Sequence, residues 1–285
     1  MKFGTTAILM LAVYGGSPLA AQDSLSVWKK TGSAGLNFSQ VQLSDWAAGG
    51  DNAVALSSLF ALSANYKADP IAWDNTLELG YGLTRLGGNP IRKSDDKIVL
   101  SSKFARAAVG KWNYSGLVDF RTQFADGYDY GADPKKRISG FMAPGYAVLA
   151  LGGEYKPNDH FSTLLSPVTG KMTFVLDDSL SDAGAFVGTP GKRTKNELGW
   201  FVTTLLKIKP MENVDLSTKL NLFSNYEKLS NVDVIWEGLA LMKVNKWISA
   251  SFTAKFIEDD NVRDEKGKIR RQFKELFAMG LLYQF

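Results

Sequence analysis

The chain has 285 residues, of which 45% are hydrophobic, 12% aromatic and 22% charged, which is too apolar for a disordered protein and sufficient for one full-sized domain. Lysine and arginine number 33 against 29 aspartates and glutamates, and this mild excess is scattered among acidic residues, which argues against a nucleic-acid partner. Cysteine is absent, which excludes disulfides, thiolate metal sites, a cysteine nucleophile and attachment through a lipidated cysteine.

Residues 1–21 have the features of a secretory signal peptide. Lys2 precedes an apolar run over residues 6–14, and helix-breaking and then small residues follow it. The run is too short to span a membrane, which disfavours the alternative of an anchor helix. We therefore expect residues 1–21 to be cleaved, residues 22–30 to form a periplasmic segment and residues 31–285 to form the exported domain.

Beyond this leader, no stretch reaches 18 apolar residues, so no transmembrane helix is expected. The chain instead alternates with period two: residues 53–67 are apolar at even positions and residues 71–85 at odd positions. Such two-faced strands have the roughly 9 to 11 residues that a membrane strand needs. Twelve candidate strands are centred near residues 37, 60, 78, 103, 118, 147, 168, 202, 219, 237, 252 and 278.

The connections between these strands alternate in length. The short ones are residues 68–70, Gly110, residues 157–158, residues 210–212 and Asn245, and the long ones are residues 45–52, 86–97, 125–137, 177–197, 227–231 and 258–269. This asymmetry is typical of outer-membrane barrels, in which the short turns are periplasmic and the long loops extracellular. The predicted fold is therefore all-β: a transmembrane up-and-down antiparallel β-barrel of about twelve strands.

Aromatic residues support this topology because they collect near the expected membrane boundaries. The periplasmic group is Tyr66, Trp73, Trp112, Tyr155, Phe161, Trp247, Tyr283 and Phe285, and the smaller extracellular group is Phe124, Trp200 and Tyr226. Aromatic residues also favour strands in general. Their clustering at strand ends, mostly on the outward parity, favours two aromatic belts.

The last stretch, ELFAMGLLYQF at residues 275–285, is apolar at every second position up to Phe285. An unpaired strand edge in lipid leaves backbone groups without partners, at several kcal/mol each. We therefore expect this strand to close the barrel against the first one, around residues 35–43. The ending Gly280-x-x-Tyr283-x-Phe285 also resembles the carboxyl-terminal signal that outer-membrane barrels present to their insertion machinery.

Three segments resemble an uncharacterised family of Bacteroidota-type outer-membrane barrels that is catalogued as a domain of unknown function. They are SDWAAGGDN (44–52), FMAPGYAVLALGGEYKPNDHF (141–161) and LSPVTGKMTFV (165–175). The resemblance would run from about Trp28 to Phe285. It implies a location and a fold, and it provides no catalytic residue.

An enzymatic function is not expected. His160 is the only histidine, and the predicted topology places it beside the periplasmic turn at residues 156–159. Asp159 and Ser162 are close in sequence but lack the arrangement of a catalytic triad. The acidic segment 258–268 lacks the spacing of a calcium loop, so neither a metal nor a cofactor is expected.

The inward parity carries charges of both signs in similar numbers. The lumen-lining candidates are Asp74, Glu78, Lys103, Asp119, Arg121, Asp215, Lys219, Asp233, Glu237 and Lys255. Twelve strands enclose a lumen wider than the eight-strand case that side chains fill and narrower than a sixteen-strand porin. These charges can therefore form a closed polar plug or line a narrow wet pore.

Two local features bear on this choice. Pro144 and Pro167 interrupt predicted strands and should each mark a bulge or a break, because proline cannot donate to a ladder. The long loop at residues 177–197 contains an apolar segment, residues 185–187, that could fold inward as a constriction, although an exposed loop is the simpler interpretation.

Two functions follow from the predicted barrel. The first is a narrow passive pore for small polar solutes, with the inner charges setting its preference. The second is a non-conducting scaffold subunit of a larger envelope assembly, with partner contacts through the extracellular loops. In both, the expected partners are outer-membrane lipid and possible envelope proteins.

Overall fold

The structure is a computed structural model that describes residues 27–43, 51–263 and 267–285. The expected signal peptide, residues 1–21, and most of the 44–52 loop lie outside the described residues. Strand β1 (Trp28–Val41) begins before residue 31, where the sequence predicts the start of the barrel.

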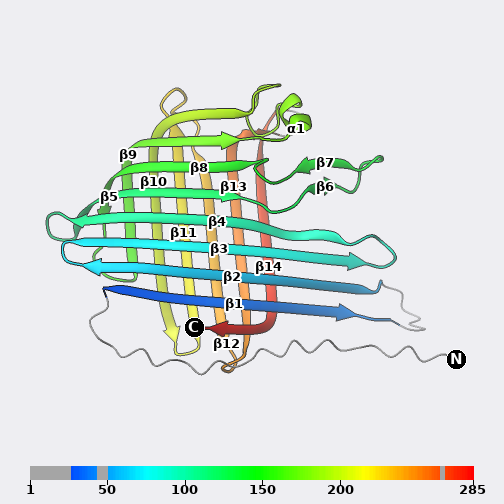
Figure 1. Cartoon of the computed structure of the whole chain (residues 1–285), viewed down its shortest axis with the longest axis horizontal. Helices are drawn as coiled ribbons and strands as arrows, with labels where there is room; N and C mark the ends of the chain where they lie inside the picture. The colour runs from blue at the N-terminus through cyan, green and yellow to red at the C-terminus, as the bar shows by residue number, and fades with distance from the viewer. Residues whose placement is uncertain (1–26, 44–50, 264–266) are drawn as a thin grey trace.

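Twelve strands form one closed antiparallel barrel in which each strand pairs with the next barrel strand along the chain and β14 pairs with β1 (Figure 1). Besides β1, they are β2 (Ala53–Ala68), β3 (Ile71–Leu86), β4 (Arg92–Ala107), β5 (Trp112–Thr122), β8 (Gly145–Tyr155), β9 (Phe161–Phe174), β10 (Thr194–Met211), β11 (Val214–Asn225), β12 (Asp233–Lys243), β13 (Ile248–Arg263) and β14 (Ile269–Gln284). Each predicted strand centre falls in a different barrel strand. The predicted fold class is confirmed.

The remaining elements lie in the long connections. Strands β6 (Gly127–Asp129) and β7 (Lys136–Ser139) form a separate two-stranded sheet between β5 and β8. Helix α1 (Asp178–Asp182) lies between β9 and β10. Within the part of the chain that the structure describes, no helix has the length and apolar character needed to cross a membrane.

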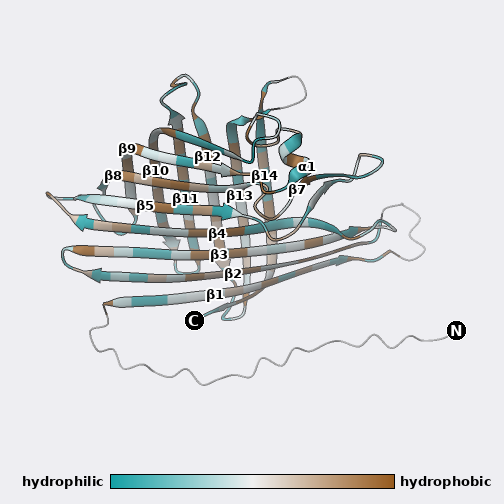
Figure 2. Cartoon of the chain, turned by 45° about the horizontal axis from the view of Figure 1, so that its top comes forward, coloured by the Kyte–Doolittle hydropathy of each residue, from teal (hydrophilic) through white to brown (hydrophobic). Residues whose placement is uncertain are grey.

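Hydrophilic and hydrophobic residues follow one another along the strands (Figure 2). Successive side chains point to opposite faces of the sheet, because a strand repeats every two residues. On β5 the outward Tyr114 and Val118 are 72% and 48% exposed, whereas the inward Leu117 and Asp119 are each 5% exposed. Large outward residues such as Phe277 on β14 are also exposed. An apolar outer face around a polar interior is the arrangement of a membrane-spanning barrel.

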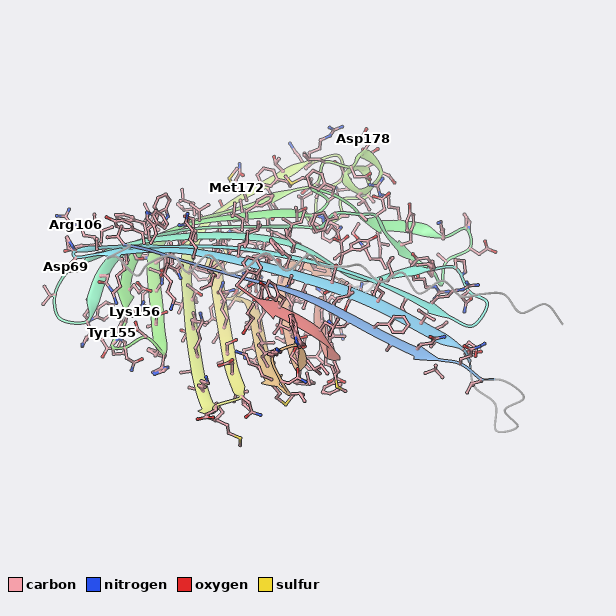
Figure 3. The ribbon with its side chains drawn as sticks, turned by 60° about the horizontal axis from the view of Figure 1, so that its bottom comes forward. Asp69, Arg106, Tyr155, Lys156, Met172 and Asp178 are labelled. Atoms are coloured by element: carbon pink, nitrogen blue, oxygen red, sulfur yellow. The ribbon has the colours of Figure 1, made fainter. Side chains whose placement is uncertain are left out.

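The two rims differ, as the connection lengths predict. Asp69, Arg106, Tyr155 and Lys156 lie in or beside short connections and gather at one end of the barrel, whereas Asp178 lies at the other end (Figure 3). We call these ends the periplasmic and extracellular rims, because short turns are periplasmic in outer-membrane barrels.

Aromatic rings contact one another along the periplasmic rim. The ring of Trp28 lies 5.3 Å from that of Tyr66 and 5.8 Å from that of Trp73, measured between centroids. Further ring contacts at this rim join Trp112 to Tyr155, Trp247 to Tyr283 and Tyr283 to Phe285. Trp28 is an additional member of the expected belt. Such rings are suited to the boundary between water and lipid.

Barrel strands extend into three of the predicted loops. Strands β4, β10 and β13 extend into the loops expected at residues 86–97, 177–197 and 258–269, of which residues 92–97, 194–197 and 258–263 are strand. Outside the bilayer, water contacts both faces of a strand, so pairing can continue through charged residues that break the apolar alternation. The change in sequence pattern marks the end of the apolar band rather than the end of the strands.

The barrel is flattened into two layers, with β1–β5, β8 and β9 in one layer and β11–β14 crossing behind them (Figure 1). Strand β10 bends from one layer into the other. Beside the bend, the register shifts in both ladders of β9 near Pro167, between Leu151 and Gly153 of β8 and between Gly199 and Phe201 of β10. Proline provides no N–H to the ladder, and the predicted bulge at Pro167 is confirmed.

Two glycines let the strands approach closely at this bulge. A Cβ atom on Gly152 would lie 2.0 Å from the carbonyl oxygen of Leu165, and one on Gly199 would lie 2.0 Å from the carbonyl oxygen of Ser224. Both oxygens are backbone atoms of the adjacent strand, β9 for Leu165 and β11 for Ser224. Neither can move aside as a flexible side chain can. Only glycine fits at these two positions.

Pro144 and the 185–187 segment differ from their expected roles. Pro144 lies immediately before β8, so it precedes this strand and does not interrupt it. Val187 is buried in a small apolar cluster with Ala143, Val175 and Leu180, and Ala185 and Phe186 pack against it. The segment is neither exposed nor a separate constriction, since it packs against residues of its own and the preceding connection.

The barrel closes between β14 and β1 over a short ladder. Residues 33–37 pair with residues 280–284, and Gly32 and Phe285 exchange backbone hydrogen bonds of 2.6 and 2.9 Å. Closure of the last strand on the first is therefore confirmed. Its position is displaced toward the periplasmic rim from the predicted residues 35–43.

Beyond this ladder the two strands diverge (Figure 1). A Cβ atom on Gly280 would lie 2.3 Å from the carbonyl oxygen of Leu36, so glycine allows the close approach at the end of the ladder. The described residues 38–43 and 269–279 do not pair with each other. The extracellular part of the seam thus leaves a free edge on β14, with backbone groups that require hydrogen-bond partners in lipid.

We predict that Gly152→Ala and Gly199→Ala each destabilise the barrel by about 1–3 kcal/mol, because an added methyl group meets backbone atoms. Thermal unfolding in detergent, followed by the shift in gel mobility of the folded barrel, measures this. Gly170→Ala on β9 is the matched control, since its Cβ would meet nothing within 4 Å. Equal stability of all three variants would contradict the assignment.

Candidate functional site

The ten expected lumen-lining residues all lie on the inner face of the barrel. Ladder pairs place Asp74 opposite Lys103, and place Glu237 opposite both Lys219 and Lys255. Some inner charges also contact charges on strands that are not neighbours in the sheet. These side chains must therefore meet across the interior of the barrel. The ten are Asp74, Glu78, Lys103, Asp119, Arg121, Asp215, Lys219, Asp233, Glu237 and Lys255, on strands β3, β4, β5, β11, β12 and β13.

A network of five charges bridges the two layers of the barrel. Arg121 on β5 donates from Nε to Asp119 at 2.7 Å, and its Nη1 lies 3.8 Å from Glu237 on β12. Lys219 Nζ lies 3.8 Å from the second oxygen of Asp119, and Lys255 Nζ lies 2.8 Å from Glu237. Strands β8 to β11 separate β5 from β12 around the barrel. This network therefore joins walls that are distant along the sheet.

A second network lies closer to the extracellular rim. Lys171 Nζ on β9 lies 2.6 Å from Asp233 on β12 and 3.0 Å from Asp259 on β13. The three side chains are 8%, 9% and 10% exposed. The ammonium group also lies 5.4 Å from the ring centroid of Phe223. A buried charge is tolerated only when it is paired, so these three residues depend on one another.

The carboxylates of Asp233, Asp259 and Asp260 offer oxygens within 4.8 Å of one another. Carboxylate oxygens are ligands that hard cations prefer. The ammonium of Lys171 already bridges Asp233 and Asp259, and Asn231 Nδ2 donates to Asp260 at 3.0 Å. We therefore interpret this acidic group as part of a structural ion network.

The other inner charges are also paired. Lys103 contacts Asp74 and Glu154, Lys97 lies 2.9 Å from Glu78, Lys243 lies 3.5 Å from Asp215, Lys195 lies 3.1 Å from Glu197, and Lys274 on β14 contacts Asp95 on β4. Lys274 and Asp95 connect the back layer to the front layer near the free edge of β14. Pairs of opposite charge thus occur along the length of the interior.

One side of the interior is dry. Leu117, Ala150, Leu164, Phe201 and Phe223 form a buried apolar cluster. They come from β5, β8, β9, β10 and β11, which surround the bulge at Pro167. The opposing inner faces are packed against each other here, as in the core of a soluble protein.

The other side is wet. The inner residues of β1–β3 are mostly small, and Ser33, Ser57, Ala61, Ser63 and Thr76 are all half-buried. Charges on this side are accessible to water: the side chain of Glu78 is 50% exposed and that of Lys97 is 38% exposed, against 7% for the side chain of Asp119. The described interior therefore combines a packed half with a half in which small side chains leave polar groups in contact with water.

Several inner charges were not among the sequence candidates, for two physical reasons. Lys171 follows the bulge at Pro167, where the inward parity changes from even (Leu164 and Ser166) to odd (Thr169 and Lys171). Asp95, Lys97, Glu197 and Asp259 lie in strand segments that the sequence pattern assigns to loops. Glu154 and Lys274 follow the regular inward parity of their strands, so that signal could have identified them.

His160 lies in the turn between β8 and β9. Its Nδ1 atom lies 3.2 Å from the carbonyl oxygen of Lys207, and its backbone N–H donates to Asn158 Oδ1. Both partners are compatible with a residue that stabilises a turn. The absence of an enzymatic function stays a prediction.

We predict that Lys171→Met lowers the free energy of unfolding by about 3–5 kcal/mol, because it leaves two buried carboxylates without their cation. Denaturant-induced unfolding in detergent micelles measures the loss. A triple variant that also carries Asp233→Asn and Asp259→Asn should recover much of it, since it removes the unpaired charges. No loss in the single variant would show that these residues are not coupled.

The solved structures with remote similarity to this chain include two barrels. The COG4313 outer membrane channel from Pseudomonas putida F1 is 10% identical, with a TM-score of 0.40, over 94% of this chain and 99% of that chain. The translocator domain of the autotransporter NalP from Neisseria meningitidis is 12% identical, with a TM-score of 0.39, over 90% of this chain and 87% of that chain. No curated protein matches the sequence.

A family model matches residues 38–128, from the end of β1 to β6. This is shorter than the expected range of residues 28–285, and of the three motifs only the one at residues 44–52 lies within it. The match does not identify a bacterial group. Over residues 38–128 the chain matches an uncharacterised family, as the motifs suggest, and the description of that family is Protein of unknown function (DUF3078).

Proposed function

We propose that this chain is an outer-membrane β-barrel that gives small polar solutes a narrow, passive path through the membrane. The observation that carries the proposal is the wet half of the interior, where small inner side chains of β1–β3 leave charged groups accessible to water. A wall of this kind offers room and hydration to a small polar solute.

Three features support placement in the outer membrane. The outer face is apolar, aromatic rings contact one another along the periplasmic rim, and long connections lie at the opposite rim. The predicted signal peptide at residues 1–21 adds the expectation of export, although it lies outside the described residues.

The paired charges support a path that is narrow and only weakly selective among ions. The network around Arg121 connects the two layers and reduces the open cross-section. On the wet side, Glu78 pairs with Lys97 and Asp74 with Lys103, so both signs face the same space. Rings of one sign produce strong ion preference, whereas mixed signs do not.

We expect purified protein to give stepwise currents in planar lipid bilayers, and we expect Ala61→Trp to lower the unitary conductance by at least about half, because the ring fills the inner wall. Ala61 faces inward opposite Ser33 and Glu78. The matched control is Leu62→Trp, one residue along the same strand on the outer face, which should leave the conductance unchanged. Equal effects of both substitutions would contradict a path along this wall.

The second candidate is a non-conducting scaffold subunit. The free edge of β14 favours it, since an unpaired edge is a template for a strand of another chain. The charge networks that connect the layers also favour it, since they brace the interior without requiring solute passage.

Arg121→Ala separates the two functions, because it removes the cation that links Asp119 to Glu237. In a pore, this change widens the lumen and alters the unitary conductance in bilayers. In a scaffold, wild type and variant are both silent, and proteins at fixed stoichiometry co-purify with the wild type in mild detergent. Currents in the wild type without stoichiometric partners would exclude the scaffold.

A further inference from the structure

One polar row interrupts the apolar outer face near the periplasmic rim. Lys30, Ala64, Asn75 and Ser102 are ladder neighbours on β1 to β4, and they share the outward parity. The aromatic residues Trp28, Tyr66, Trp73 and Phe104 form the next outward row toward the periplasm, and Gly32, Leu62, Leu77 and Leu100 form the next row toward the bilayer centre. The polar row therefore lies between an aromatic belt and hydrocarbon-facing leucines.

Hydrogen bonds hold the neutral members of the polar row in place. Trp73 Nε1 donates to Ser102 Oγ at 2.8 Å, and Ser102 Oγ donates to Asn75 Oδ1 at 2.7 Å. Asn75 Nδ2 donates to the carbonyl oxygen of Ala64 at 3.2 Å. These contacts leave the ammonium of Lys30 as the one formal charge in the row.

Lys30 is available to an anion from outside the described part of the chain. Among the described residues, no carboxylate forms a salt bridge with it, in contrast to the inner lysines of the same barrel. A charged group on the lipid-facing side is costly unless it is paired or reaches the interface. Lys30 lies one row from the aromatic belt toward the bilayer centre, from where its long side chain can reach the level of the lipid headgroups.

A groove begins at this lysine and continues over the leucines. It has a volume of about 400 Å³, and its lining includes Lys30, Ala64 and Asn75 as well as Leu62, Leu77 and Phe285. At one side, the ring of Phe285 covers Gly32 so closely that a Cβ there would lie 2.3 Å from the ring, so glycine is what lets the ring lie at this position. The polar end faces the periplasmic rim, and the apolar end faces the bilayer centre.

We propose that this groove binds one anionic phospholipid of the inner leaflet, with its phosphate on Lys30 and an acyl chain along Leu62 and Leu77 beside Phe285. The order of the rows matches the order of the lipid, in which the headgroup lies at the belt and the chain points to the bilayer centre. An anionic lipid fits better than a zwitterionic one, because a headgroup amine would compete with Lys30 for the phosphate. The site requires a bilayer around the barrel but no conduction through it.

Native mass spectrometry in a mild non-ionic detergent tests the proposal with palmitoyl-oleoyl phosphatidylglycerol and the matching phosphatidylcholine as probes. We expect the wild type to retain one phosphatidylglycerol with about fivefold preference, which is the usual effect of one lysine near an anionic lipid. Lys30→Gln should remove the preference and leave the barrel folded, because the side chain is exposed. Equal retention of both lipids by the wild type would overturn the proposal.

A second pair of variants tests the groove itself. Ala64→Trp fills the apolar groove and should abolish retention of phosphatidylglycerol, whereas Ala240→Trp, at an outward position on β12 outside the groove, should not. The heat-dependent shift in gel mobility of each variant verifies a folded barrel before the measurement. Equal loss of lipid from both tryptophan variants would also overturn the proposal. Bilayer currents are an independent readout, so failure of the pore would not be mistaken for failure of this site.

Discussion

Backbone hydrogen bonding in hydrocarbon is the constraint on which the structure depends. A strand edge in lipid leaves N–H and C=O groups without partners, so a membrane sheet must close on itself. Here closure is achieved by a flattened barrel rather than a round one. Gly152 and Gly199 let the strands approach at the corner beside Pro167, and Gly280 does the same at the seam, because no side chain fits at these contacts. Among the described residues, the free extracellular edge of β14 is where backbone groups lack partners on the neighbouring strand β1.

Flattening divides the interior into two environments with different consequences. Where the layers meet, apolar residues around Leu164 and Phe201 pack as in a soluble core, and the charge on Lys171 is tolerated because two carboxylates surround it. Where inner side chains are small, water reaches Glu78 and Lys97. The packed half gives the barrel rigidity, and the wet half provides the proposed solute path. One shape thus accounts for both the plug-like and the pore-like features of the inner charges.

The outer face has its own division of roles. Most outward side chains are apolar, and one apolar residue can replace another there because these side chains contact only hydrocarbon. The polar row at Lys30 is different, because three neutral groups are held by mutual hydrogen bonds and the charge faces lipid. In the groove beside it, the ring of Phe285 lies over Gly32, where no side chain would fit. Membrane contact and the proposed solute path therefore involve opposite faces of the same strands.

The sequence by itself determined the twelve strands, their order around the barrel and the inward side of most of them, because alternation with period two and the lengths of connections are local properties. That information was enough to place all ten expected charges on the inner face. It was insufficient for Lys171, since the bulge at Pro167 reverses the parity of β9, and for Asp259, since its strand continues beyond the apolar band. Only the tertiary structure decided which charges pair, how flat the barrel is and where the seam ends. Those features depend on contacts between residues far apart in the chain, and the alternation along one strand does not indicate which distant residues it will contact.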